Sequence, residues 1–263
     1  LIPSAILADR AALMLEIRRF CIALAYFTRI PVPAWVGWSS AELNRATRYF
    51  PLVGLLVGLA AAAALYGAGL VLPWKIAVLL SMLTSLLMTG AFHEDGLADS
   101  ADGFGGGWEK AQVLAIMKDS RIGTYGALAL LMAFTLKFAA LDALGLTALV
   151  ALPVVHAASR GATLMLMASM RYVREDDSTR AKPVAEELGA TEWLPGALFG
   201  VLPAALAWQQ GWLGGAAALA VPGTCLVCTL LWGKYLQRRI GGYTGDALGA
   251  CQQIAEISAY LVL

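Results

Sequence analysis

The chain has 263 residues, of which 59% are hydrophobic and 14% charged, and its mean hydropathy is +0.70. An ordinary soluble domain is about 45–50% apolar and about 25% charged, so this composition excludes a soluble globular enzyme and a disordered chain. The formal net charge of +1 offers no broad basic surface, which argues against a nucleic-acid partner. The composition predicts an all-α protein, a polytopic integral membrane helical bundle in contact with the lipid bilayer.

The first 48 residues form a charged N-terminal segment that we expect in the cytoplasm or at the membrane interface. Apolar residues recur every three or four positions between residues 13 and 28, which predicts an amphipathic helix. Such a helix either lies on the membrane surface or packs against the protein, and the pattern favours neither. Residues 1–8 lack the basic start and long apolar core of a cleaved secretion signal.

Long uncharged runs predict the membrane-spanning helices, since a span needs roughly 20 apolar residues. Residues 49–74 and 76–92 predict an antiparallel hairpin, and residues 193–233 are long enough for two spans that turn near residue 210. Further apolar runs cover residues 122–141, 143–159, 161–170 and, more weakly, 247–263. Together the runs predict about six or seven transmembrane helices in a single membrane domain, residues 1–263.

The distribution of charge between the runs predicts the topology. Most charged residues fall in segments 1–48, 93–121 and 171–192, whereas the short turn near residue 74 holds one lysine and the turn near residue 210 no basic residue. The positive-inside rule therefore places the three charged segments in the cytoplasm. The pattern leaves open whether the protein forms a homo-oligomer.

The most informative segment, residues 93–121, is expected to be an acidic cytoplasmic loop that contains the active site. Asp95, Asp99 and Asp102 are spaced so that on a helix they fall within an arc of about 60°. Like charges this close repel one another, and a divalent cation compensates for that repulsion. Carboxylate oxygens favour Mg²⁺ or Mn²⁺, which bind substrate phosphates. A solvated acidic loop that caps a membrane helix is the alternative.

Basic residues elsewhere are candidates to bind phosphate. Lys118 and Arg121 flank Asp119 at a membrane boundary, where anchoring at the interface is the alternative. Arg160 follows His156 by four positions in an apolar stretch, and an ionisable residue inside a span is a functional candidate.

Two glycine-rich segments, residues 104–107 and 241–249, could let backbone amides approach a phosphate or could serve as linkers. The second contains Asp246, which either approaches the same site or caps a helix.

Several blocks of sequence carry a family resemblance. The strongest is His93–Gly103, and the others are Phe27–Pro33, Phe50–Gly54, Met117–Gly126, Ser159–Gly161 and Gly242–Gly249. Together they extend over nearly the whole chain and resemble the cobalamin synthase family, the adenosylcobinamide-GDP ribazoletransferases. The strongest block is similar to the family's His-x-Asp-Gly-Leu-Ala-Asp-Thr-x-Asp-Gly, with Ser100 in place of the threonine and Glu94 at a position that is often apolar.

The resemblance implies a multi-pass transferase of cobalamin (vitamin B12) biosynthesis in the bacterial cell inner membrane, with its active-site loop in the cytoplasm. The reaction would join adenosylcobinamide-GDP to α-ribazole or α-ribazole 5′-phosphate. It would release GMP and form adenosylcobalamin or its 5′-phosphate by Mg²⁺-dependent phosphotransferase chemistry.

The resemblance and the residue patterns together assign roles to individual residues. The expected metal ligands are Asp95, Asp99 and Asp102. The expected catalytic residues are these three aspartates with Lys118, Arg121 and Arg160. The expected substrate-binding residues are His93, Gly96, Gly103, Asp119, Ser120 and Asp246. One of the aspartates, with Asp102 as the first candidate, would accept the proton of the ribazole 3′-hydroxyl.

Two other classes of protein fit part of the pattern. A polytopic membrane transporter explains the spans and the ionisable residues inside them, but not acids clustered beside glycines in a cytoplasmic segment. A lipid enzyme resembling the CDP-alcohol phosphotransferases would share the metal chemistry and differ in its substrate.

Overall fold

The computed structural model describes residues 4–173 and 188–263, with side chains from Arg10 onward, and the regular elements of this part are helices. The all-α class predicted from composition is confirmed. The α-helices are α1 Ser4–Phe27, α2 Ser40–Ala46, α3 Phe50–Gly69, α4 Trp74–Thr89, α5 Phe92–Gly106, α6 Lys110–Lys118, α7 Thr124–Leu144, α8 Ala148–Ser169, α9 Ala190–Gln209, α10 Gly215–Arg239 and α11 Gly245–Leu261. Short 3₁₀ helices are η1 Ala34–Val36, η2 Thr47–Tyr49 and η3 Gly145–Thr147.

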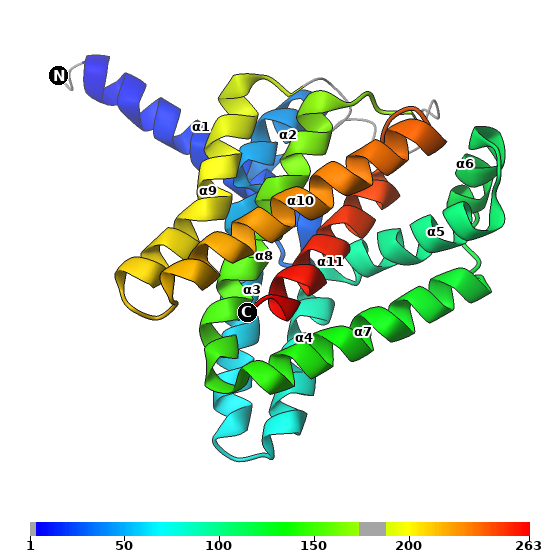
Figure 1. Ribbon diagram of the computed structural model, residues 1–263. Coiled ribbons are helices and arrows are strands. Elements are labelled where there is room, and N and C mark those ends of the chain that lie inside the picture. The colour runs from blue at the N-terminus through cyan, green and yellow to red at the C-terminus, as the bar shows by residue number, and fades with distance from the viewer. Residues whose placement is uncertain (1–3, 174–187) are drawn as a thin grey trace.

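The bundle is built around α8, which packs against α3, α9, α10 and α11 (Figure 1). Helices α3 and α4 form the predicted first hairpin, and its turn lies at the lower tip in Figure 1. Helices α9 and α10 form the predicted second hairpin, which turns at residues 210–214. Both hairpins therefore follow the uncharged runs in the sequence.

The number of apolar spans is lower than predicted. Among the described residues, four helical stretches are long and apolar enough to cross a membrane, or five if α4 and α5 form one bent span. The longest stretch, Thr124–Ser169, contains both α7 and α8. The class of helical membrane protein is confirmed, while the expected six or seven spans become four or five by length and composition.

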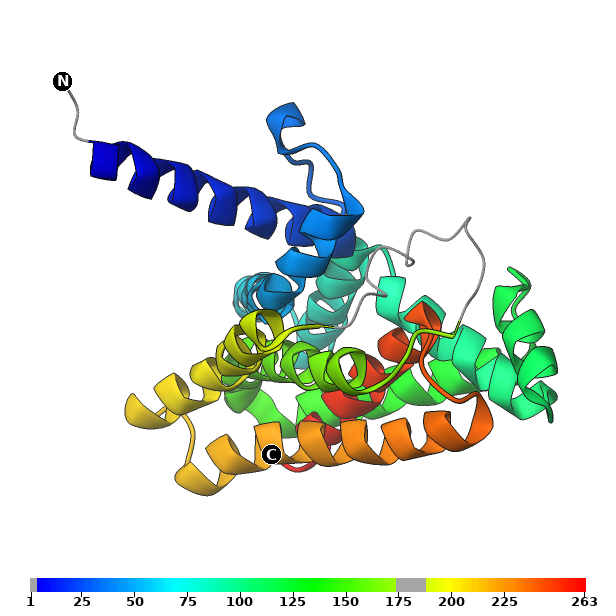
Figure 2. The ribbon, with the colours of Figure 1, turned by 90° about the horizontal axis from the view of Figure 1, so that it is seen from above.

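Helix α1 combines the two alternatives left open by the sequence. Its C-terminal part packs into the protein, with Ile22 and Phe27 buried. Its N-terminal part extends away from the bundle (Figure 2), and Leu13 and Ile17 are 61% and 40% exposed. One helix thus contributes to the core at one end and presents apolar side chains at the other.

Glycines allow α3 and α8 to touch backbone to backbone. A Cβ atom at Gly54 would fall 2.3 Å from the carbonyl oxygen of His156, and one at Gly58 would fall 2.6 Å from Cα of Pro153. The four-residue spacing of these glycines puts both on the face that meets α8. This close contact sets the position of His156 and the residues that follow it.

A sharp bend separates α4 from α5. Gly90 and Ala91 both have left-handed backbone conformations, with φ of 65° and 60°, and the two helices meet at 87°. Left-handed residues end a helix because they cannot continue its hydrogen-bonding pattern. The segment predicted as an acidic loop is therefore corrected: α5 begins at once after the bend, and α6 follows it.

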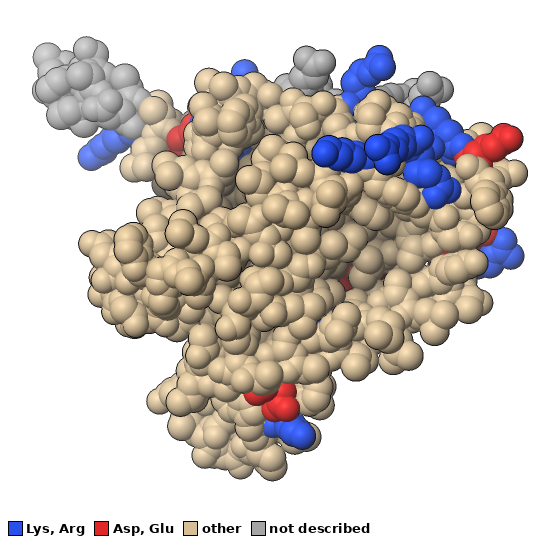
Figure 3. Space-filling view, in the orientation of Figure 1, with Lys and Arg blue, Asp and Glu red and all other residues tan. Residues whose placement is uncertain are grey.

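The charge on the surface is divided between two ends of the molecule. In Figure 3 lysines and arginines gather along the upper edge, over the ends of α5, α6 and α10, and a wide surface below them is nearly uncharged. At the opposite tip, Lys75 lies 4.0 Å from Asp142. An uncharged belt between two charged ends is the pattern expected of a protein that crosses a bilayer.

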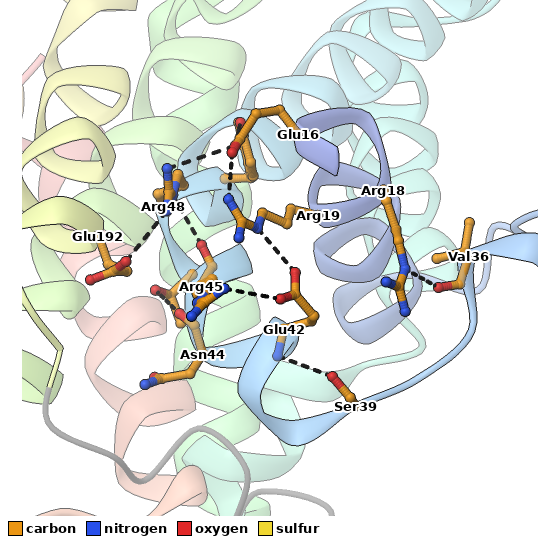
Figure 4. Close-up of polar contacts among 12 residues, drawn as sticks. Glu16, Arg18, Arg19, Val36, Ser39, Glu42, Asn44, Arg45, Arg48 and Glu192 are labelled. Carbon is orange, nitrogen blue, oxygen red and sulfur yellow. Dashed lines mark hydrogen bonds and ion pairs between the residues drawn. The ribbon is translucent and has the colours of Figure 1, made fainter. Parts of the chain in front are cut away.

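An ion-pair network joins α1 to its neighbours (Figure 4). Arg19 bonds to Glu42 of α2 at 3.0 Å and also pairs with Glu16, while Arg48 of η2 reaches Glu192 of α9 at 3.3 Å. Burial opposes ionisation of Glu16, but hydrogen bonds from Tyr49 and Arg19 outweigh it and lower the pKa of Glu16. The network fixes the base of α1 to the bundle.

Candidate functional site

Four side chains form a stripe along α5. Phe92, Asp95, Asp99 and Asp102 follow one another at intervals of three, four and three residues, which places them on one side of a helix. Asp95 is exposed, Asp99 is partly buried and Asp102 is 9% exposed. The three aspartates thus share one face, as their spacing predicts, and Phe92 continues that face toward α4.

Asp102 is bonded to the start of α7. Its carboxylate oxygens accept hydrogen bonds from the backbone N–H groups of Gly123 at 2.7 Å and Gly126 at 2.8 Å. The first N–H groups of a helix lack partners within the helix, so a carboxylate there satisfies them and meets the positive end of the helix dipole. Any side chain at Gly123 or Gly126 would collide with this carboxylate. The alternative of an acidic residue that caps a helix therefore applies to Asp102.

The acidic face fits a divalent cation in part. Asp95 and Asp99 are one helical turn apart and offer the hard oxygen ligands that Mg²⁺ prefers. Asp102 fits less well, because both of its oxygens already accept backbone N–H groups. Within the described residues, no group of three or more His, Cys, Asp and Glu side chains is arranged to hold a metal ion. The metal site of three aspartates stays a prediction.

Residues 118–121 lie in the connection between α6 and α7, at the far end of α5 from the bend. Arg121 bonds to Asp119 at 2.6 Å, and both this arginine and Ser120 are exposed. Hydrogen bonds from the Arg121 side chain and backbone lower the pKa of Asp119. Lys118 ends α6, is exposed, and also has a polar partner.

A pocket that is partly open to solvent lies at the other end of α5. Its aromatic lining consists of Tyr26, Phe27, Phe50, Phe92, Tyr172 and Tyr243. The last two stand on neighbouring strand-like segments joined by an isolated parallel bridge. Burial, together with the nearby Tyr172, Asp246 and Tyr243, raises the pKa of Tyr26. The charge of Asp246 therefore acts on this pocket.

Two of the predicted residues, His93 and Arg160, line the pocket. Arg160 is 3% exposed, and its Nη1 donates to the carbonyl oxygen of His156 at 3.0 Å and lies 3.2 Å from His156 Nδ1. Its Nε has no hydrogen-bond partner, and no carboxylate pairs with Arg160 among the described residues. A buried guanidinium with an unused Nε donor and no directly paired carboxylate among the described residues favours an anionic ligand, because burying a charge is costly.

Glycines bring α5 against the start of α11. A Cβ atom at Gly96 would fall 2.7 Å from the carbonyl oxygen of Asp246, and one at Gly249 would fall 3.2 Å from that of His93. The side chain that caps α11 is Thr244, which accepts from the N–H of Ala247 at 3.1 Å. Asp246 is therefore placed beside the first turn of α5, where the pocket and the acidic face meet.

A buried polar network below the pocket was not expected from the sequence. Lys137 of α7 lies 2.8 Å from Glu256 of α11, which is also 3.6 Å from His156 Nε2. Gln253 accepts from Lys137 at 3.0 Å and donates to Glu94 at 3.1 Å. The signal in the sequence was that Lys137 and Glu256 each interrupt an apolar run. The sequence alone does not show that these two residues pair with each other.

The structure divides the predicted site residues into two groups. His93, Gly96, Arg160 and Asp246 meet at the pocket end of α5. Gly103, Asp102 and residues 118–121 lie at the opposite end, where Gly103 packs against Met117 of α6. Asp95 and Asp99 lie between the two groups on the exposed side of the helix.

This architecture defines a polytopic helical membrane protein with an aromatic pocket that contains a buried arginine, and with an acidic helix face beside it. The chain belongs to the cobalamin-5-phosphate synthase family, whose sequence profile matches residues 19–263. The resemblance seen in the sequence is therefore confirmed.

Three curated relatives carry the name adenosylcobinamide-GDP ribazoletransferase. The protein from Shewanella frigidimarina is 47% identical over 252 residues, which cover 94% of each chain. That from Shewanella amazonensis is 46% identical over 252 residues, covering 94% of this chain and 95% of the relative. That from Shewanella baltica is 46% identical over 261 residues, covering 98% and 97%. No solved structure matches the chain.

Proposed function

We propose that the chain is an adenosylcobinamide-GDP ribazoletransferase that joins adenosylcobinamide-GDP to α-ribazole or its 5′-phosphate. The ribazole 3′-oxygen forms a bond to the phosphorus attached to cobinamide. The bond from that phosphorus to the oxygen of GMP breaks, GMP leaves, and the hydroxyl proton passes to a base. The product is adenosylcobalamin or its 5′-phosphate. The family and the names of the curated relatives support this activity.

The observation that carries the proposal is the buried guanidinium of Arg160. Phosphoryl transfer depends mainly on positioning the substrates and on stabilising negative charge. Arg160 has an unused Nε donor, is buried, and lines a pocket that begins where the acidic face of α5 begins. It is suited to bind phosphate oxygens of the reacting substrates, while Lys118 and Arg121 lie farther along and would bind phosphate only if the connection moved inward.

Mg²⁺ is proposed as the cofactor on the chemistry of the acidic face. Asp95 and Asp99 would hold it, and the ion would neutralise charge on the pyrophosphate oxygens. Asp102 holds the start of α7 and thereby orients α5. Since both of its oxygens already accept backbone N–H groups, Asp102 is a weaker candidate for the base than its position in the sequence indicated.

The metal proposal is tested by Asp95→Asn and Asp99→Asn. Losing about 3 kcal/mol of phosphoryl stabilisation corresponds to roughly a hundredfold in rate. Each variant should release GMP about a hundredfold more slowly and need more Mg²⁺, with an unchanged melting temperature in metal-free buffer. Near-normal turnover at the same Mg²⁺ concentration in both variants would remove these aspartates from the metal site.

The role of Arg160 is tested by Arg160→Lys, which keeps the charge but loses the planar array of donors. We expect about a hundredfold slower GMP release, as for loss of one donor to a developing negative charge. Arg45→Lys is the matched control, because Arg45 is exposed and lies in the network around α1. Equal turnover in both variants would make Arg160 structural.

The proposed activity itself is tested in detergent, without a membrane compartment. Purified protein with adenosylcobinamide-GDP, α-ribazole and Mg²⁺ should produce equimolar GMP and adenosylcobalamin. A transporter would yield no GMP under these conditions. A lipid enzyme would instead consume a CDP-lipid, and excess CDP-lipid would suppress GMP release.

We propose that the protein lies in the bacterial inner membrane with the α5–α6 segment in the cytoplasm. The gathering of basic residues at that end supports this orientation. A cysteine at Glu109 should react with an impermeant thiol reagent only from the inside. A cysteine at Val71, which is 80% exposed in the α3–α4 turn, should react only from the outside. The reverse pattern would invert the proposed topology.

A further inference from the structure

Six aromatic side chains of this protein meet at one pocket. The chain contains eight phenylalanines and eight tyrosines, and three of each line the pocket beside Arg160. They come from segments far apart in the sequence, namely α1, α3, α5 and the paired segments around residues 172 and 243. Core packing alone does not require so many aromatic rings around space that reaches solvent.

The rings are arranged as walls around the space. Phe27 meets Phe50 edge to face at 4.2 Å between ring centres and stacks on the ring of His93 at 5.4 Å. Tyr172 and Tyr243 meet edge to face at 5.5 Å. The start of α11 also lines the pocket, with Gly245 and Gly249. A lining rich in aromatic rings suits a flat aromatic group.

The polar groups of the pocket indicate which flat aromatic group the pocket would bind. The described lining includes Arg160, whose Nε has no hydrogen-bond partner, but no aspartate or glutamate. Guanine presents two adjacent N–H donors, which a carboxylate would satisfy. A benzimidazole is apolar apart from one ring nitrogen that accepts a hydrogen bond. The lining therefore matches a benzimidazole better than a guanine.

The position of the pocket fits the reaction. Phe92 belongs both to the pocket lining and to the stripe that continues through Asp95 and Asp99. A base held at Phe92 would place its attached ribose toward the acidic face of α5. Arg160, which also lines the pocket, would remain available to phosphate.

On this basis, and resting on the proposed function, we propose that the pocket binds the benzimidazole base of α-ribazole, with Phe50 and Phe92 as residues that determine affinity for that base. The guanosine part of adenosylcobinamide-GDP binds elsewhere. The pocket thus selects the nucleophilic substrate by the shape and low polarity of its base.

The test compares the Michaelis constants of the two substrates in matched variants. Phe92→Leu removes an aromatic face from a residue that is 40% exposed, so folding should be little affected. The KM for α-ribazole should rise about tenfold or more, in line with the loss of one stacking ring. The KM for adenosylcobinamide-GDP should stay within a factor of about two. Phe50→Leu should act in the same direction.

Phe104→Leu is the control, because it makes the same change on the same helix, where Phe104 contacts Trp232 and Tyr235 instead of the pocket. Both Michaelis constants should be unchanged in it. A rise in the KM for adenosylcobinamide-GDP in Phe92→Leu would show that guanosine binds in the pocket. Unchanged Michaelis constants for both substrates would show that the pocket binds neither base. Each result would overturn the inference while leaving the proposed function intact.

A binding measurement separates this inference from the proposed function. Equilibrium dialysis of α-ribazole against the purified wild type and Phe92→Leu requires no turnover. Binding to the wild type that weakens in Phe92→Leu supports the inference even if no GMP is formed, whereas GMP formation alone tests the proposed function. Wild-type protein that turns over but binds α-ribazole no better than Phe92→Leu would overturn the inference.

Discussion

Two groups of charged residues tie the helices of this protein together, and they lie in opposite surroundings. The network around α1 joins Glu16, Arg19 and Glu42 where water reaches at least one partner, since the Glu16 side chain is 36% exposed. The network below the pocket joins Lys137 to Glu256, whose side chains are 6% and 1% exposed.

The comparison shows that similar ion-pair geometry has different consequences in the two places. In the network around α1, water reaches Glu16, so solvent and salt compensate in part for a missing partner and each pair contributes less than a buried pair. In the interior, nothing replaces a missing partner, and the remaining charge is left in a medium of low dielectric constant. The interior pair is therefore critical once formed, although it adds little net free energy compared with an apolar pair.

The largest expected effect follows from breaking the interior pair. Glu256→Gln leaves Lys137 charged and unpaired, so we expect the free energy of unfolding to fall by about 3–5 kcal/mol. Thermal unfolding in detergent measures the loss. The double variant with Lys137→Met removes the stranded charge and should recover most of it. A loss below about 1 kcal/mol in Glu256→Gln would contradict the comparison.

A smaller effect is expected at Asp102, whose environment is intermediate between the two networks. Asp102→Asn keeps one acceptor oxygen but turns an NH₂ group toward the N–H donors of Gly123 and Gly126. We expect a loss of about 1–2 kcal/mol, the usual value for a helix cap. The loss should be the same with and without Mg²⁺. Asp95→Asn is the control, and an equal loss there would contradict a specific capping role.

At the network around α1, where Glu16 is 36% exposed but Arg19 and Glu42 are 8% and 16% exposed, we expect a loss smaller than that of Glu256→Gln. Arg19→Met keeps the apolar stem and removes the pairs to Glu16 and Glu42. The difference from the wild type should shrink as salt is raised from 0.01 M to about 1 M, because screening weakens exposed pairs. A loss as large as that of Glu256→Gln would erase the distinction between the two networks.

The smallest effect is a dependence on pH. The pKa of Glu16 is lowered in the folded protein, so its contribution to stability is fully present above the unfolded value of about 4.3. That contribution is lost as pH falls through the folded pKa. The melting temperature of the wild type should therefore fall more below about pH 4.3 than that of Glu16→Gln. Parallel curves would show that Glu16 contributes nothing.

The sequence predicted those features that depend on neighbouring residues. Uncharged runs gave both hairpins, and the spacing of Asp95, Asp99 and Asp102 gave their common face. The helical state of that segment was missed because its charge marked it as a connection between apolar spans. In the fold its glycines allow close packing, as Gly96 does against α11, and tertiary contact outweighs their low helix propensity.

Features that join distant segments could not be predicted in this way. Lys137 and Glu256 are separated by more than a hundred residues, and each reads in the sequence only as an interruption of an apolar run. The aromatic pocket likewise draws on several distant segments. Arg160 was recognised because a charge in an apolar run is costly wherever it lies, and that argument needs no knowledge of its neighbours.

Helix α5 is held at both of its ends. Near its start, Glu94 accepts a hydrogen bond from Gln253 of α11, and near its end Asp102 is bonded to the first turn of α7. The like charges of Asp95 and Asp99 therefore repel one another on a helix that cannot easily turn or shift to separate them. The repulsion energy between the two aspartates is therefore overcome once, during folding, and not each time a substrate binds. A face of this kind has a low reorganisation energy, which favours repeated turnover over conformational signalling.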